Sequence, residues 1–328
     1  MDYHNTTISE EEPSGAKKVS SRFTGHPWRA LLVMVGILWV FKLLIVLVLK
    51  GVLSLPEDLK GEFINGKSVP ILIQLIEGGT LVVGFLAFVI VPFYLRIPRG
   101  ASTFKGYLDD IRFTRTKPLF RLLLLIISCN IILILCQRAG SIVYQLSEGN
   151  AITSKFIFQV FDLSQALPPK SFLSFSLFFS MFEEVAFRGV LLTMFLDIHP
   201  QRKAIIYSAI AFGATNLPAV FTSQLVGFDG RLLVLSVGQV VWAFLFGLFY
   251  GYLFIKSGSL LPPMIIHWLS NVFQAPLTAY WQTAPDAVRA LYGVVFGYGL
   301  AAILLILWVR FFAAKWLNMP DMPLQRTR

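Results

Sequence analysis

Charged residues are scarce in this chain of 328 residues: Asp, Glu, Lys and Arg make up 14% of it, whereas hydrophobic residues make up 56%. A soluble domain usually carries about 25% charged residues, so the composition argues against a soluble globular protein. The apolar residues also gather in blocks of about twenty, the length that a helix needs to cross a hydrocarbon core. The sequence therefore predicts an all-α, polytopic bundle of transmembrane helices in a lipid bilayer.

Cysteine and histidine are scarce as well. The two cysteines, Cys129 and Cys136, lie in one apolar block, and their helical separation of about 10 Å along the axis excludes a mutual disulfide. The four histidines are His4, His26, His199 and His267. Only His267 lies in an apolar block beside other polar residues. No short apolar stretch with a small-residue cleavage site precedes the first block, so we expect no cleavable signal peptide.

The basic residues give a net charge of +10 but form no single patch. They lie at alternate ends of the apolar blocks, which the positive-inside rule explains, so we expect no nucleic-acid partner. The same rule places both termini in the cytoplasm and requires an even number of spans. We predict about eight spans, at 29–50, 70–95, 119–137, 171–196, 203–222, 232–256, 260–281 and 291–313.

The chain divides into four parts in this interpretation. Residues 1–28 form a disordered cytoplasmic tail, and 29–170 hold the first three spans and a connector. The connector, 138–170, includes the apolar stretch "FIFQVFDLSQALPP" and is expected to lie on the membrane surface. The remaining spans form a core at 171–313, followed by a second cytoplasmic tail at 314–328. We find no internal repeat.

Several charges lie within the predicted spans, where each opposes insertion by about 2.5–3.5 kcal/mol. Lys42 and Glu77 lie at matching depths on successive spans, which favours a structural ion pair between them. In the fourth span, "FFSMFEEVAFRGVLL", Glu184 and Arg188 are four residues apart and share a helix face, so they can neutralise each other. Glu183 points about 100° away from Glu184 and is not neutralised by that pair.

The seventh span adds His267 and Asn271, again four residues apart on one face. Between these two spans lie "FG" at Phe212, then Gly238, Gly247 and Gly251 at a spacing that allows close helix packing, and then "SGSLLPP". This order of motifs resembles the CPBP family of intramembrane proteases, which are similar to the CAAX prenyl endopeptidases and the Abi bacteriocin-immunity proteins. The resemblance covers roughly residues 180–275. The matching residues are Glu183, Glu184, Arg188, Gly189, Phe212, Gly213, His267 and Asn271.

The resemblance implies a helical bundle that encloses a hydrated chamber. In that family the residue corresponding to Glu183 is thought to activate water together with a histidine of the next span. The residues corresponding to His267 and Asn271 are thought to polarise the scissile carbonyl, while Glu184 and Arg188 support the site. A carboxylate in a water-poor chamber suits a general base, and fixed donors lower the barrier most where water is excluded.

This chain departs from the family pattern in the second motif. It reads "FGATN", so Asn216 stands where a histidine is usual. An amide cannot take up a proton, although it can orient a water by hydrogen bonding. A catalytic zinc normally has three protein ligands from histidine, cysteine or carboxylate. Glu183 and His267 would have only amides to help them, so we predict no metal and no other cofactor.

Three function classes follow from these residues. The first is an endopeptidase, a hydrolase that cleaves a membrane-associated peptide or protein with water activated by Glu183. The second is a non-proteolytic relative that binds a membrane partner or peptide in the same chamber, and Asn216 motivates it. The third is a transporter, which the absence of an internal repeat disfavours.

Overall fold

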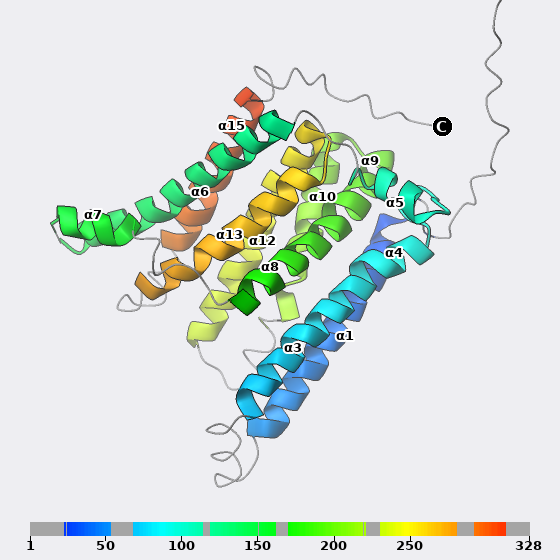
Figure 1. Ribbon diagram of the computed structural model, residues 1–328, viewed down its shortest axis with the longest axis horizontal. Helices are drawn as coiled ribbons and strands as arrows, with labels where there is room; N and C mark the ends of the chain where they lie inside the picture. Colours follow the sequence, from blue (N-terminus) through cyan, green and yellow to red (C-terminus); the bar gives the residue numbers. More distant parts are fainter. Residues whose placement is uncertain are drawn as a thin grey trace, which may run out of the picture.

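The computed structural model describes residues 23, 25–53, 68–113, 119–149, 151–161, 170–218, 220, 230–280 and 292–312. Within these ranges the chain is helical and has no β-strand, which confirms the predicted all-α class (Figure 1). The two predicted cytoplasmic tails, 1–28 and 314–328, lie almost entirely outside the described residues.

The N-terminal half consists of the helices α1 (Pro27–Leu53), α3 (Ser68–Phe85), η1 (Leu86–Ile90), α4 (Val91–Tyr94), α5 (Phe104–Asp110), α6 (Leu119–Ser147) and α7 (Ser154–Phe161). The C-terminal half consists of α8 (Lys170–Glu184), η2 (Val185–Leu192), α9 (Thr193–Ile198), α10 (Gln201–Ala214), α12 (Gly230–Ser257), α13 (Leu261–Tyr280), η3 (Gly293–Leu300) and α15 (Ala301–Phe312).

The segments η1, η2 and η3 are π-helical and belong to longer continuous helices. The residues that flank η2, Glu184 and Thr193, keep helical φ angles of −65° and −60°, so α8, η2 and α9 form one uninterrupted rod. A π-helical turn inserts an extra residue and rotates the side chains that follow it. Such turns are rare and occur often at functional sites.

Five helices are long and apolar enough to cross a membrane, which supports an integral, multi-pass membrane protein. They are Pro27–Val48, Gln74–Tyr94, Phe120–Ser147, Ser236–Ser257 and Val295–Phe312. The other predicted spans correspond to the α8–η2–α9 rod, α10 and α13. Helix α10 has only 14 residues and ends at Ala214, whereas the sequence predicted a span to residue 222. The count of eight and the cytoplasmic location of the termini stay predictions.

Two glycines of α12 allow this helix to approach α10 closely. A Cβ on Gly247 would lie 2.9 Å from the Ala209 Cα, and one on Gly251 would lie 3.3 Å from the Ile205 Cγ2. A Cβ on Gly238 would meet nothing within 4 Å. The small-residue spacing therefore predicted close packing correctly at Gly247 and Gly251, whose contact fixes α10 beside α12, and wrongly at Gly238, where no neighbour approaches.

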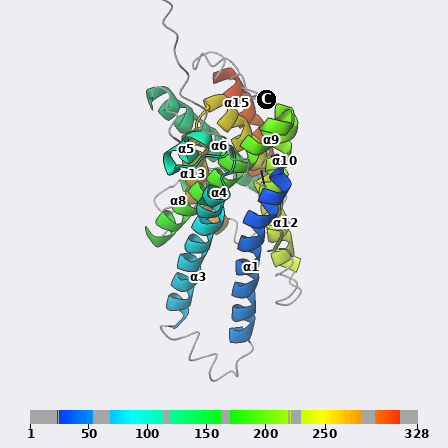
Figure 2. The same ribbon diagram turned by 90° about the vertical axis from the view of Figure 1, so that its right-hand side faces the viewer.

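Helices α1 and α3 lie side by side and extend beyond the rest of the bundle at one end (Figures 1 and 2). The bundle has two buried apolar clusters. One contains Phe187 and Phe212 with residues of α1 and η1, and the other contains Phe246 and Tyr250 with residues of α6 and α15. The polar residues of the fourth and seventh predicted spans lie between these clusters.

The connector predicted at 138–170 begins later in the structure. Helix α6 continues to Ser147, about ten residues beyond the expected end of the third span at residue 137. The short helix α7 follows and projects sideways from the bundle (Figure 1). Its Phe158 is 78% exposed, which fits an apolar contact with lipid. Residues 162–169 of the connector lie outside the described part, and a surface location for α7 stays a prediction.

Candidate functional site

The site is built on the junction of α8 and η2. Glu183 and Glu184 end the α-helical part, and Arg188 lies one turn later within η2. Glu184 and Arg188 are fully buried, and Glu183 is 8% exposed. Ser208 of α10 donates a hydrogen bond of 2.7 Å to the Phe187 carbonyl oxygen of η2. This bond provides a partner for a backbone group in the irregular segment and ties it to α10.

One carboxylate oxygen joins three residues of the site. The Arg188 Nη1 donates to the Glu184 Oε1 at 2.8 Å, which confirms the predicted pair. The His267 Nδ1 lies 2.8 Å from the same oxygen. Because a carboxylate that pairs with a guanidinium can only accept, Nδ1 carries the proton of this bond. Glu184 therefore fixes the tautomer and the orientation of His267, and leaves Nε2 for other partners.

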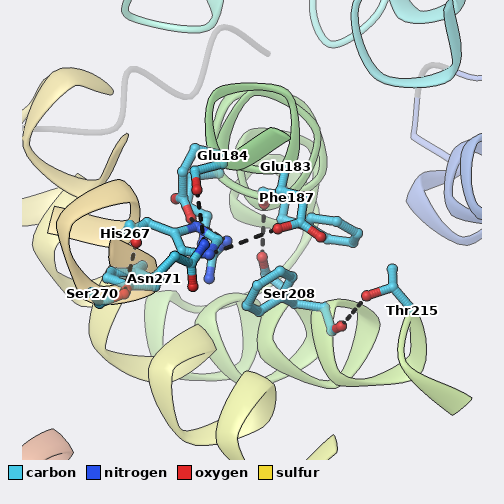
Figure 3. A network of polar contacts seen from close by, with 12 residues as sticks. Glu183, Glu184, Phe187, Ser208, Thr215, His267, Ser270 and Asn271 are labelled. Carbon is cyan, nitrogen blue, oxygen red and sulfur yellow. Dashed lines mark hydrogen bonds and ion pairs between the residues drawn. The ribbon is translucent and has the colours of Figure 1, made fainter. Parts of the chain in front are cut away.

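The second nitrogen of His267 faces the other glutamate. The distance from His267 Nε2 to Glu183 Oε2 is 3.7 Å, which is too long for a direct hydrogen bond. Among the described residues Nε2 has no hydrogen-bond partner. Figure 3 shows both carboxylates converging on the imidazole from the same helix turn. A small molecule such as water can contact Glu183 and Nε2 at the same time.

Aromatic rings enclose these charges. The Arg188 guanidinium lies 4.4 Å above the Phe212 ring centroid and 5.1 Å above that of Tyr250. The His267 ring stacks on Tyr250, with centroids 5.0 Å apart and an interplanar angle of 24°. Cation–π contacts stabilise a guanidinium where water is excluded. The enclosure lowers the local polarity and strengthens every electrostatic interaction within the cluster.

Asn271 lies one turn after His267 on α13. Its Nδ2 donates to the Ser180 Oγ of α8 at 3.0 Å, one turn before Glu183. Ser270, between the two, donates to the His267 carbonyl oxygen at 2.7 Å and bonds the Tyr250 hydroxyl at 3.1 Å. These bonds fasten α13 to α8 through Asn271 and to α12 through Ser270, and they hold the polar face of α13 toward the glutamates (Figure 3).

Asn216 lies in the turn that follows α10, where its backbone N–H donates to the Gly213 carbonyl oxygen at 3.1 Å. Among the described residues no hydrogen bond joins the Asn216 side chain to Glu183, His267 or Asn271. The structure therefore brings together Glu183, Glu184, Arg188 and His267, with Asn271 beside them. A role for Asn216 in orienting water stays a prediction.

Lys42 does not form the predicted ion pair with Glu77. Its Nζ donates instead to the Thr215 carbonyl oxygen at 3.3 Å, at the end of α10. The prediction compared only the depth of the two residues in the membrane. Depth does not give the rotation of a helix, and the rotation of α1 turns Lys42 toward the end of α10.

Metal ligands do not gather within the described residues, since no group of three His, Cys, Asp or Glu side chains could hold an ion there. The Glu184 oxygen nearest His267 already accepts from Arg188. The two nitrogens of His267 face different carboxylates. This donor set does not suit a catalytic zinc, and the absence of a metal cofactor stays a prediction.

Comparison with known families agrees with this geometry. Residues 165–273 match the family model described as type II CAAX prenyl endopeptidase Rce1-like. This segment includes η2, α10, α12 and the site residues of α13, and it excludes α1 with Lys42. The match confirms the predicted resemblance to the CAAX protease-like family. No curated protein matches the chain significantly.

Proposed function

We propose that this protein is an intramembrane endopeptidase of the CAAX protease-like type, which hydrolyses a peptide bond in a membrane-associated peptide or protein. The observation that carries this proposal is the 3.7 Å approach of Glu183 Oε2 to His267 Nε2. Both groups are buried, and the imidazole is held by Glu184. A water between them would be about 2.8 Å from each atom, the length of an ordinary hydrogen bond.

In the first step Glu183 acts as general base. Its carboxylate takes a proton from this water as the water oxygen forms a bond to the carbonyl carbon of the scissile peptide. The carbonyl π electrons move to the oxygen, which becomes the oxyanion of a tetrahedral intermediate. A carboxylate within hydrogen-bond reach of the water meets the geometric requirement for such a base.

Asn271 stabilises the oxyanion in this proposal, and His267 holds the water. The neutral imidazole carries its proton on Nδ1, bonded to Glu184, so Nε2 accepts a hydrogen bond from the water beside Glu183. The Asn271 amide uses one N–H for Ser180 and has a second one to offer. Donors fixed in advance in an enclosed site lower the barrier because they need little reorganisation when the charge develops.

In the second step Glu183, now a carboxylic acid, returns its proton to the nitrogen of the leaving amine. The carbon–nitrogen bond breaks, the oxyanion collapses, and one product leaves with a new carboxyl group and the other with a new amine. Glu183 is then a carboxylate again. Glu184 and Arg188 act as positioning residues, because they hold His267 and have no need to contact the substrate.

The test compares the purified wild-type protein with Glu183→Gln in lipid nanodiscs, on a panel of membrane-associated peptides. The substitution keeps the size of the side chain but removes its basicity, so cleavage should fall by about 10²–10⁴-fold. Glu77→Gln serves as the control, since it removes a carboxylate of the membrane region that lies outside the site. Equal product from wild type and Glu183→Gln would overturn the proposal.

The alternative is a non-proteolytic relative that binds a membrane partner in the same place, and Asn216 is the observation that favours it. A neutral amide stands where a proton-accepting histidine is usual, and it makes no side-chain hydrogen bond with Glu183 in the described structure. In this case Asn216→His would create cleavage that the wild type lacks. Glu183→Ala, still folded and inserted, would keep the cellular function. A phenotype lost in that variant excludes the alternative.

A further inference from the structure

Helix α1 lies outside the segment that matches the protease family, yet it directs one cation toward the site. Lys42 is half-buried, whereas its neighbours Val40, Leu43 and Leu44 are 61%, 47% and 55% exposed. These neighbours suit contact with lipid. The helix therefore turns Lys42 inward, away from the surface where a charge is least favourable.

The ammonium group is anchored at the end of α10. Its Nζ donates to the Thr215 carbonyl oxygen at 3.3 Å. Thr215 itself is buried, and its hydroxyl donates to the Phe212 carbonyl oxygen at 2.7 Å (Figure 3). The Phe212 ring in turn lies under the Arg188 guanidinium. A short chain of contacts thus leads from α1 to the charged cluster.

A charge count shows what Lys42 supplies. When both are ionised, Glu183 and Glu184 carry two negative charges, and Arg188, already bonded to Glu184, carries one positive charge. With His267 neutral, as in the proposed mechanism, these charges balance only when the Lys42 ammonium is included. Helix α1 turns Lys42 toward this cluster, and in the described structure Lys42 makes no direct ion pair with Glu183. A buried carboxylate without a compensating cation tends to take up a proton and lose its charge.

We infer that Lys42 is a positioning residue of this site, which keeps Glu183 in its ionised, proton-accepting form and fixes the turn at Thr215 at the end of α10. The inference rests on the proposed function, because an ionised Glu183 matters for a general base. It also explains how a part of the chain beyond the family match takes part in the chemistry. Lys42 acts through Glu183 and does not contact the scissile bond.

The first experiment measures charge coupling without any substrate. Thermal unfolding is recorded in nanodiscs for Lys42→Met, Glu183→Gln and the double variant. Each single change leaves the other charge uncompensated, so the double variant should lose less stability than the sum of the single losses. The control is the corresponding set with Glu77→Gln, which should be additive. Additivity at position 183, or coupling at position 77, would overturn the inference.

The second experiment measures cleavage. Lys42→Met should lower kcat by about tenfold or more while KM changes by less than about twofold, because a weaker base slows the chemical step and leaves binding intact. Lys42→Arg keeps the charge and should retain most of the activity. Unchanged kcat in a folded Lys42→Met protein, or an equal loss in Lys42→Arg, would overturn the positioning role.

The two experiments also separate this inference from the proposed function. If the wild-type protein cleaves no peptide but coupling to position 183 is found, the proteolytic proposal fails and Lys42 still stands as the counter-charge of Glu183. If the wild type cleaves but coupling is absent, the proteolytic proposal stands and the inference about Lys42 fails.

Discussion

The first helix and the fourth predicted span both carry charges into the membrane region, but they do so in different surroundings. Only 17% of the spanning window of α1 is buried within the protein, so nearly all of its side chains must be apolar. All eight residues of η2 are buried, so this segment can hold Arg188 beside Glu184. Protein, not lipid, surrounds the charges there. In the middle of α1 the charge of Lys42 lies on the face that turns toward the bundle.

This difference explains why the helices of the site are those that a search for apolar spans leaves out. The α8–η2–α9 rod, α10 and α13 contribute Glu183, Ser208 and His267, and none of them is among the five long apolar helices. Helix α10 has only 14 residues, whereas the other two carry charged or polar side chains on the faces that meet in the interior. Apolar composition thus identifies the peripheral helices in the sequence, whereas the spacing of polar residues identifies the helices of the interior.

The largest expected effect tests whether enclosure makes the Glu184–Arg188 pair essential. Arg188→Met leaves a buried carboxylate without its cation and should reduce the free energy of unfolding by about 3–5 kcal/mol. The matched control is Arg99→Gln, which breaks the exposed Arg99–Asp197 pair at the protein surface and should reduce it by about 0–1 kcal/mol. Thermal unfolding in nanodiscs measures both. Similar losses would contradict the contrast between interior and periphery.

The next effect concerns catalysis at the interior face of α13. Asn271→Ala removes a proposed oxyanion donor and its bond to Ser180, so kcat should fall by about 10²–10³-fold. Asn271→Asp keeps the size but offers no N–H, so it should fail to rescue the activity. Steady-state kinetics on a cleaved peptide measures the change. Activity retained in a folded Asn271→Ala protein would exclude Asn271 from the reaction.

A smaller effect tests the packing that places α10 against α12. Gly247→Ala would bring a Cβ within 2.9 Å of the Ala209 backbone, and such overpacking should reduce stability by about 1–3 kcal/mol. Gly238→Ala, on the same helix, meets nothing within 4 Å and should be neutral or stabilising by up to about 1 kcal/mol. Equal melting temperatures for the two variants would show that α10 and α12 do not approach so closely.

The smallest effect concerns Glu77, which the sequence paired with Lys42. Since the described structure shows no ion pair between them, Glu77→Gln should change stability by less than about 1 kcal/mol and leave cleavage unchanged. The melting temperature and the rate of cleavage are compared with those of the wild type. A larger loss would restore the sequence-based pairing and weaken the assignment of Lys42 to Glu183.

The sequence by itself determined the all-α membrane class, because blocks of apolar residues of that length can satisfy their backbone groups only as helices in lipid. It also determined the Glu184–Arg188 pair, because residues four apart on one helix meet wherever the helix is placed. Only the tertiary structure decided that Glu184 also accepts from His267, that Nε2 then faces Glu183, and that Lys42 bonds the end of α10 rather than Glu77. Contacts between helices depend on how each helix is rotated and where it crosses its neighbour. The spacing of residues along one helix does not determine either quantity.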